Sequence, residues 1–285
     1  MTANGHTTKI RLLLEICERY PVFDTQKADT VLDEIESLFQ HRRPSELTLR
    51  RLRKDCLDLN SHGIEKEYVD AFVGMVAALE HNTAEFFEKF RLSRLHTQVE
   101  FIAFDFALLC RRLGYPDEAM DAYWGITDIN IGYVDASKGV FASAIDCLAL
   151  EDALAAERNL TRFHRVALEP HEVDALERLK YLIARMATLN IPQLAVRARV
   201  EVAAAVLRAA KEPIFGVELG IGGDDRISYA FKLRAPPEEV AVLNTAIARS
   251  KANRSDDIRA QLLTVSCVVD REPLRATQTT ERTGA

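Results

Sequence analysis

Apolar residues recur at helical spacing through most of the first 212 residues of the chain. The period predicts a series of helices separated by short connections, and short connections favour antiparallel neighbours. The expected helices cover 8–19, 26–40, 45–60, 65–80, 83–92, 97–113, 116–127, 134–157, 170–189 and 192–211. Residues typical of helix starts support this prediction. Ser45 and Thr83 can cap the first turn of a helix, and Pro170 and Pro192 are tolerated in the first turn.

The spacing of apolar residues changes after Pro213. IFGVELGI (214–221) and ISYAFKL (227–233) have the composition of β-strands, and the intervening GGDD predicts a hairpin turn. Pro236 and Pro237 open a helix through about Lys251, and LLTVSCVV (262–269) predicts a third strand. The result is a ββαβ module, short for a free-standing domain, which we expect to pack on helix 192–211.

These elements predict a mainly α fold made of stacked antiparallel helical hairpins, solenoid-like, with a small C-terminal ββαβ module. The expected organisation is a helical-hairpin array over 1–212, an α/β module over 213–271 and a disordered tail over 272–285. The tail is assigned because its sequence is polar and offers little to a core.

The clearest helical hairpin lies between Glu100 and Ile126. Gly114 breaks the helical period, and Pro116 suits the first turn of a new helix. The apolar stripe before the break contains Ala103, Phe106, Ala107 and Cys110, and the stripe after it contains Ala119, Tyr123 and Ile126.

This hairpin resembles one tetratricopeptide repeat, a family of stacked helix pairs that bind other proteins. Gly114 matches the turn glycine, Ala119 the small residue where the helices touch, and Tyr123 the aromatic of the second helix. In the first helix Phe106 and Ala107 match the leucine and the small residue. At the family's large, aromatic and last small positions stand Ala103, Cys110 and Ile126. The resemblance implies a helical surface that binds a protein partner.

Composition narrows the classes of function. The chain has 285 residues, 48% of them apolar, so it can build a sizeable core. A formal net charge of -6 argues against bulk electrostatic binding to nucleic acid or to an anionic membrane. There is no apolar run of membrane-spanning length, and the first residues lack a signal-peptide pattern, so a cytoplasmic protein is expected. Five dispersed cysteines without a CxxC pair predict buried, reduced thiols: Cys17, Cys56, Cys110, Cys147 and Cys267.

Candidate catalytic and metal-binding motifs are incomplete. The string VELGIGGDD resembles the cofactor loop of S-adenosylmethionine methyltransferases, but a second strand follows it where a helix is required. Two His–Glu pairs at helical spacing, His81 with Glu85 and His96 with Glu100, are typical of ordinary helix surfaces. Asp128-x-Asn130-x-Gly132 lacks the later residues of a calcium loop. We therefore assign no catalytic, cofactor-binding or metal-binding residue, and no cofactor.

Two features indicate a contact surface. A basic stretch holds Arg42, Arg43, Arg50, Arg51, Arg53 and Lys54. Trp124 lies beside Tyr123 on a short helix and cannot share its face, so it either packs on the next hairpin or anchors a partner. The best candidates for partner contact are Arg50, Arg53, Trp124 and Tyr133.

Three hypotheses follow. The first is a non-catalytic adapter or regulator that binds another protein through its helical surface. The second is an enzyme or enzyme subunit with a small-molecule site near the Gly220–Asp225 loop. The third is nucleic-acid binding through the basic helix 42–54, which the acidic net charge disfavours. The exposed edges of a three-stranded sheet would also allow pairing with a second copy of the chain.

Overall fold

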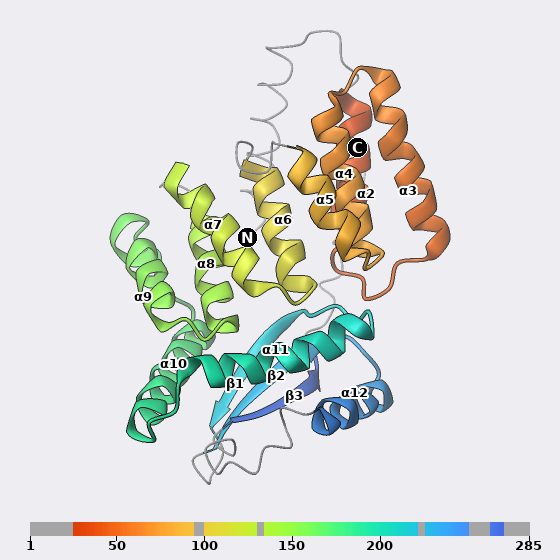
Figure 1. Cartoon of the computed structure of the whole chain (residues 1–285). Helices are drawn as coiled ribbons and strands as arrows, with labels where there is room; N and C mark the ends of the chain where they lie inside the picture. Colours follow the sequence, from red (N-terminus) through yellow and green to blue (C-terminus); the bar gives the residue numbers. More distant parts are fainter. Residues whose placement is uncertain (1–24, 94–99, 130–133, 222–225, 251–262, 271–285) are drawn as a thin grey trace, which may run out of the picture.

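The computed structural model describes residues 25–93, 100–129, 134–221, 226–250 and 263–270. Within these ranges the chain is mainly helical, with a small three-stranded sheet near its C-terminal end (Figure 1). The helices are α2 (Thr25–Leu38), α3 (Glu46–Asp58), α4 (Lys66–Leu79), α5 (Thr83–Ser93), α6 (Glu100–Arg112), α7 (Pro116–Ile129), α8 (Val134–Asp146), α9 (Leu150–Arg158), α10 (Pro170–Thr188), α11 (Gln193–Ala209) and α12 (Pro237–Arg249). A 3-10 turn, η1 (Leu59–His62), follows α3, and a π-helical turn, η2 (Asn159–Phe163), follows α9.

Most helix positions agree with the period of the sequence, but the single helix predicted over 134–157 is wrong. It is two helices, because α8 ends at Asp146 and α9 begins at Leu150. Leu148 has a left-handed backbone, with φ 58°, and is 1% exposed. Burial of this leucine offsets the cost of that backbone, which a non-glycine residue rarely adopts. The predicted helix at 8–19 and the predicted tail lie outside the described residues.

The sheet has the predicted ββαβ connectivity. Its strands, β1 (Gly216–Ile221), β2 (Ile227–Leu233) and β3 (Leu263–Val269), lie in the order β1-β2-β3. β1 and β2 are antiparallel, β2 and β3 are parallel, and α12 lies between β2 and β3 in the chain. As expected, α11 packs against this module, contacting both α12 and β3.

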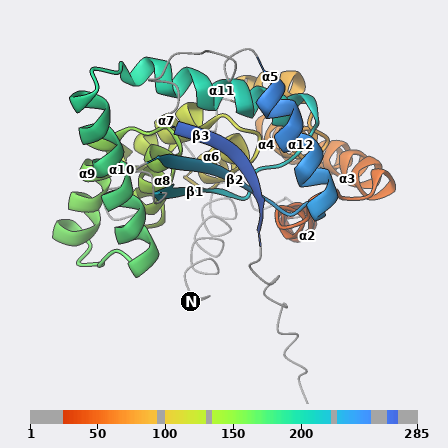
Figure 2. The same ribbon diagram turned by 90° about the horizontal axis from the view of Figure 1, so that it is seen from below.

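One face of the sheet packs against the helices. Alternate residues of β2 are buried, among them Tyr229, whose hydroxyl donates a hydrogen bond to the carbonyl oxygen of Asp146 at 2.9 Å. The Asp146 carboxylate accepts from Arg111 Nε at 2.8 Å. Burial raises the pKa of Asp146, and the positive charge of Arg111 opposes that shift. Figure 2 shows the sheet from its other side, with α6 and α8 behind it.

The buried core is continuous between the two predicted parts of the chain. It extends from Val31 in α2 to Cys267 in β3. The division into 1–212 and 213–271 stays a prediction about folding units.

Side chains occupy both outer edges of the sheet. The amide of Asn244, in α12, donates to the carbonyl oxygen of Cys267 at 2.9 Å and accepts from its N–H at 2.6 Å. On the opposite edge, Arg178 in α10 donates to the carbonyl oxygen of Leu219. A second copy pairing at these positions would have to displace these contacts, so the structure does not favour dimerisation through the sheet edges.

Cys56, Cys110, Cys147 and Cys267 are buried free thiols, as predicted, and Cys17 lies outside the described residues. Burial raises the pKa of Cys56 and of Cys267 to about 12. These thiols are therefore protonated and unreactive at neutral pH. None of the helices in the described ranges combines the length and apolar character that a bilayer crossing requires.

Gly139→Ala is expected to destabilise the protein by about 1–3 kcal/mol. A Cβ at this position in α8 would lie 2.5 Å from a ring carbon of Tyr123, which is 2% exposed and has no room to move aside. The matched control is Gly125→Ala in α7, where an added Cβ has no neighbour within 4 Å. That change should stabilise by about 0.5–1 kcal/mol through helix propensity. Urea unfolding measures both, and equal stabilisation by the two changes would contradict the packing.

Candidate functional site

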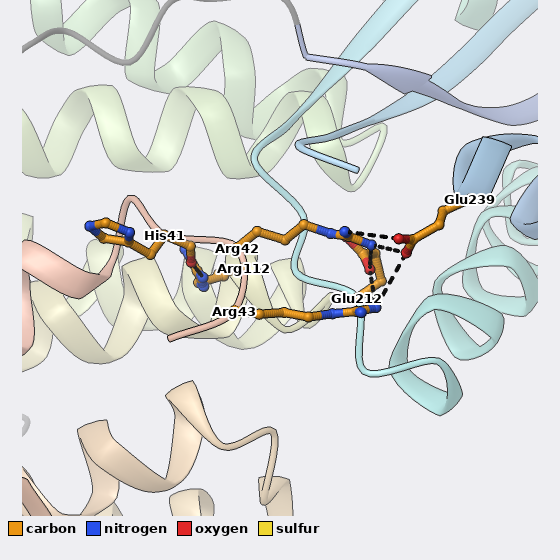
Figure 3. Close-up of polar contacts among 6 residues, drawn as sticks. All are labelled: His41, Arg42, Arg43, Arg112, Glu212 and Glu239. Carbon is orange, nitrogen blue, oxygen red and sulfur yellow. Dashed lines mark hydrogen bonds and ion pairs between the residues drawn. The ribbon is translucent and has the colours of Figure 1, made fainter. Parts of the chain in front are cut away.

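The segment joining α2 to α3 contacts side chains from distant parts of the chain, among them Arg112, Glu212 and Glu239 (Figure 3). Arg112, in α6, donates hydrogen bonds to the carbonyl oxygens of Phe39 and His41. Arg234, which follows β2, donates from Nη1 to the carbonyl oxygen of Gln40 at 2.8 Å. Because this segment lacks regular backbone hydrogen bonds, the guanidinium groups satisfy its carbonyls and fix its path.

The next two residues of this segment extend their own guanidinium groups toward the end of α11 and the start of α12. Arg42 binds both carboxylate oxygens of Glu212, through Nε at 2.6 Å and Nη2 at 2.8 Å, and also contacts Glu239. Arg43 Nη2 lies 3.2 Å from Glu212 Oε2 and 3.6 Å from Glu239 Oε2. The Glu212 side chain is 1% exposed. The ion pairs therefore join three elements around a buried carboxylate.

The aromatic ring of Phe215 contacts the two arginines that hold the segment. Its centroid lies 4.8 Å from Cζ of Arg112 and 4.3 Å from Cζ of Arg234. Burial and, to a lesser extent, the positive charge of Arg234 together lower the pKa of Arg112 to about 10. Cation–π contact and carbonyl hydrogen bonds replace part of the lost hydration. We call the set Arg42, Arg43, Arg112, Glu212, Arg234 and Glu239 the arginine junction.

His81 lies close to the arginine junction, just after α4. Its backbone is left-handed, with φ 57°. Burial and, to a lesser extent, the positive charge of Arg112 together lower the pKa of His81 to about 4, and the negative charge of Glu212 opposes the shift. The imidazole is therefore neutral at neutral pH.

The arrangement is that of a structural joint. Glu212 and Glu239 are both neutralised by guanidinium groups, so neither is available as a general base. In the part of the chain that the structure describes, no group of three His, Cys, Asp or Glu side chains could hold a metal ion. These contacts hold the α2–α3 segment against the sheet module.

Two of the predicted contact residues bond to other elements of the chain. Arg53 donates to Glu80 and to Glu85, the latter from Nη1 at 2.6 Å, and so ties α3 to the end of α4 and the start of α5. Trp124 Nε1 donates to Asp152 Oδ1 at 3.2 Å, which joins α7 to α9. Trp124 thus contacts a neighbouring helix, and its role in partner contact stays a prediction.

Arg50 and Trp124, two of the predicted contact residues, do not share one site. Arg50 projects from α3 into solvent, whereas Trp124 lies on α7, and α4, α5 and α6 separate these two helices in Figure 1. Tyr133 lies outside the described residues.

The basic stretch is mostly neutralised by the protein itself. Four of its side chains form ion pairs with carboxylates from other elements: Arg42, Arg43, Arg51 and Arg53. Phosphate groups would have to compete with those carboxylates, which does not favour nucleic-acid binding through 42–54. Arg50 has only an exposed partner one turn away, Glu46 at 2.5 Å.

The remaining sequence motifs are not assembled into a site. Gly220 and Ile221 end β1, and the rest of the Gly220–Asp225 loop, 222–225, lies outside the described residues. Among the His–Glu pairs, His81 lies near the arginine junction, whereas Glu85 binds Arg53. His96, Asn130 and Gly132 lie outside the described ranges.

The outward face of α3 carries an exposed row of apolar and basic side chains. Leu47 is 80% exposed and Leu57 is 55% exposed, and Arg50 and Lys54 lie between them on the same helical face. In the described residues Lys54 has no carboxylate partner. We call Leu47, Arg50, Lys54 and Leu57 the α3 stripe. Figure 1 shows α3 on the outside of the helical region.

The sequence analysis identified the two basic residues of the α3 stripe but did not predict that its two leucines are exposed. The buried face of α3 is formed by Leu49, Leu52 and Cys56, which share a helical stripe. Leu47 and Leu57 fall outside that stripe, and this mismatch is the signal that would have identified them.

Comparison of the chain with protein-family models, with curated proteins and with solved structures finds no match in any of the three. The tetratricopeptide resemblance of residues 100–126 therefore stays an expectation. The structure does show a helix pair there, with Gly114 at φ 79° in the turn and with Ala119 and Tyr123 buried.

Proposed function

We propose that this chain is a non-catalytic adapter or regulator that binds another protein through the α3 stripe. The observation that carries the proposal is the exposure of Leu47 and Leu57 on an outer helix whose opposite face is already buried. When a partner covers these two leucines, their apolar surface is removed from water, and this burial favours binding.

The proposal includes the finer interpretation of the fold, in which helical hairpins stack into a solenoid-like array. Sequential packing of α4 on α5, α6 on α7 and α8 on α9 supports it. Arrays of this kind need a polar face on their terminal helix to remain soluble. An outer helix such as α3 that carries exposed leucines instead is suited to receive one more helix from a partner (Figure 1).

The α3 stripe also specifies the chemistry of the partner. Its two leucines are ten positions apart and therefore about 15 Å apart along the helix axis. Arg50 and Lys54 between them favour carboxylates at the centre of the bound segment. The expected occupant is an amphipathic helix with apolar residues at both ends of its contact and acidic residues between them.

Replacing both leucines, Leu47→Ala with Leu57→Ala, should reduce partner affinity by roughly tenfold or more, because both apolar contacts are lost. The free energy of unfolding should change by less than about 0.5 kcal/mol, since both side chains are exposed. The measurement compares proteins captured from the native host by the wild-type chain and by the variant, followed by calorimetry with the acidic helix of the protein identified.

The matched control is Leu194→Ala, which removes a leucine that is 77% exposed on α11. A partner whose recovery falls with the α3 variant and not with the control supports the proposal. Identical capture by all three proteins would contradict it. So would a concentration-dependent dimer, seen by sedimentation, that the α3 variant abolishes, because the occupant would then be a second copy.

A further inference from the structure

The π-helical turn η2 exposes an aromatic side chain at a position that the helical period would bury. The buried face of α9 continues through Ala153, Ala156 and Leu160, each 0% exposed. Phe163 is the next residue in that series, yet it is 67% exposed. A hydrophobic side chain of this size in water requires a physical cause.

The backbone supplies that cause. The N–H of His164 donates to the carbonyl oxygen of Asn159 at 3.3 Å, five residues back, so the turn is wider than an α-helical turn. Leu160 remains buried and anchors the turn, and Arg165 has a left-handed backbone with φ 53°. The wider turn rotates Phe163 away from the face that Leu160 occupies.

Three arginines without a carboxylate partner in the described residues lie within five positions of this aromatic residue in the sequence. Arg158, Arg162 and Arg165 are all exposed, and among the described residues none of them forms an ion pair or a side-chain hydrogen bond. The arginines of the arginine junction, by contrast, are all bonded to acceptors in the chain. We call Arg158, Arg162, Phe163 and Arg165 the η2 patch.

We propose that the η2 patch is a peripheral contact site for an anionic phospholipid surface. An aromatic tip enters the boundary between headgroups and acyl chains, while neighbouring guanidinium groups bind lipid phosphates. The attraction is local, within about 10 Å of the surface, so the acidic net charge of the whole chain does not prevent it. This site is independent of the α3 stripe.

Two other occupants fit the η2 patch less well. Single-stranded nucleic acid prefers several stacking aromatics, and Phe163 is the one aromatic among the strongly exposed large apolar residues of the described chain. A protein partner typically covers about 800 Å² on each side, more than one turn with three arginines offers. A lipid surface deforms around a small tip and needs no matching pocket.

The test is co-sedimentation of the full chain with vesicles of phosphatidylcholine alone or mixed with phosphatidylglycerol. Wild type should bind only the anionic vesicles, and salt should weaken the binding. Arg162→Gln with Arg165→Gln should lower the partition coefficient by roughly tenfold or more, because two basic contacts are lost. Phe163→Ala should lower it several-fold at unchanged thermal stability.

Matched controls separate this site from general electrostatics. Arg50→Gln with Lys54→Gln removes the same charge from α3, and Val242→Ala removes a side chain that is 69% exposed on α12. Both should bind vesicles like the wild type. Failure of the wild type to bind anionic vesicles would overturn the proposal, as would equal losses in the α3 control. Binding of a single-stranded RNA oligonucleotide that Phe163→Ala abolishes, without vesicle binding, would assign the patch to nucleic acid instead.

Discussion

Glu212→Gln is expected to lower the free energy of unfolding by about 3–5 kcal/mol, the loss typical of breaking a buried ion pair from one side. Glutamine keeps the size of the side chain but removes its charge. Arg42, 16% exposed, would lose a carboxylate that it binds through two nitrogens, and Arg43 would lose its contact to the same carboxylate. Little water is available to replace these contacts, because the Glu212 side chain is 1% exposed.

Urea unfolding at neutral pH measures this loss, and Glu46→Gln is the matched control. Glu46 also pairs with an arginine, but its side chain is 79% exposed, so the control should change stability by less than about 0.5 kcal/mol. A loss below about 1 kcal/mol for Glu212→Gln would show that the arginine junction is not needed to hold the α2–α3 segment against α11 and α12.

The local elements of this fold could be predicted from the sequence because their causes are local. Ser45 caps α3 as expected, since its hydroxyl oxygen accepts from the N–H of Thr48 at 3.1 Å. The change of apolar period after Pro213 correctly indicated the strands and the helix between the second and the third. Each of these inferences depends on residues only a few positions apart.

The arginine junction could not be predicted, because its contacts join distant parts of the chain. Arg42 and Glu212 are 170 positions apart, and no local pattern marks them as partners. From the sequence alone, Arg42, Arg43 and Arg53 looked like unpaired positive charges. In the folded chain each of them forms an ion pair with a glutamate. Long-range ion pairing of this kind changes which side chains remain available to a partner.

The two proposed contact surfaces differ in how far the sequence indicates them. The sequence partly indicates the α3 stripe, because it shows two basic residues together with two leucines that do not fit the buried face of the helix. The η2 patch is not, because helical period places Phe163 on the buried face and only the backbone geometry reveals its exposure. Departures from regular helix thus decide the surface chemistry here.

His81 is expected to make the protein lose stability as the pH falls from about 6.5 to about 4. Its pKa in the folded protein is lowered to about 4, mainly by burial. Below pH 6.5 the unfolded chain binds a proton that the folded protein does not accept until the pH nears 4. Protonation therefore favours the unfolded state in this window. At about 1.4 kcal/mol for each pH unit, the loss approaches about 3 kcal/mol at the acidic end.

His81→Asn isolates this contribution, because asparagine tolerates the left-handed backbone at this position and does not titrate. Unfolding free energies from urea titrations at several pH values between 7 and about 4 should decline less steeply for the variant. Carboxylates that titrate at the acidic end, such as Asp70 with its two lysine partners, are present in both proteins, so their effect cancels in the difference. Parallel pH profiles for the two proteins would mean that the imidazole is hydrated in the folded protein, so that burial does not lower its pKa.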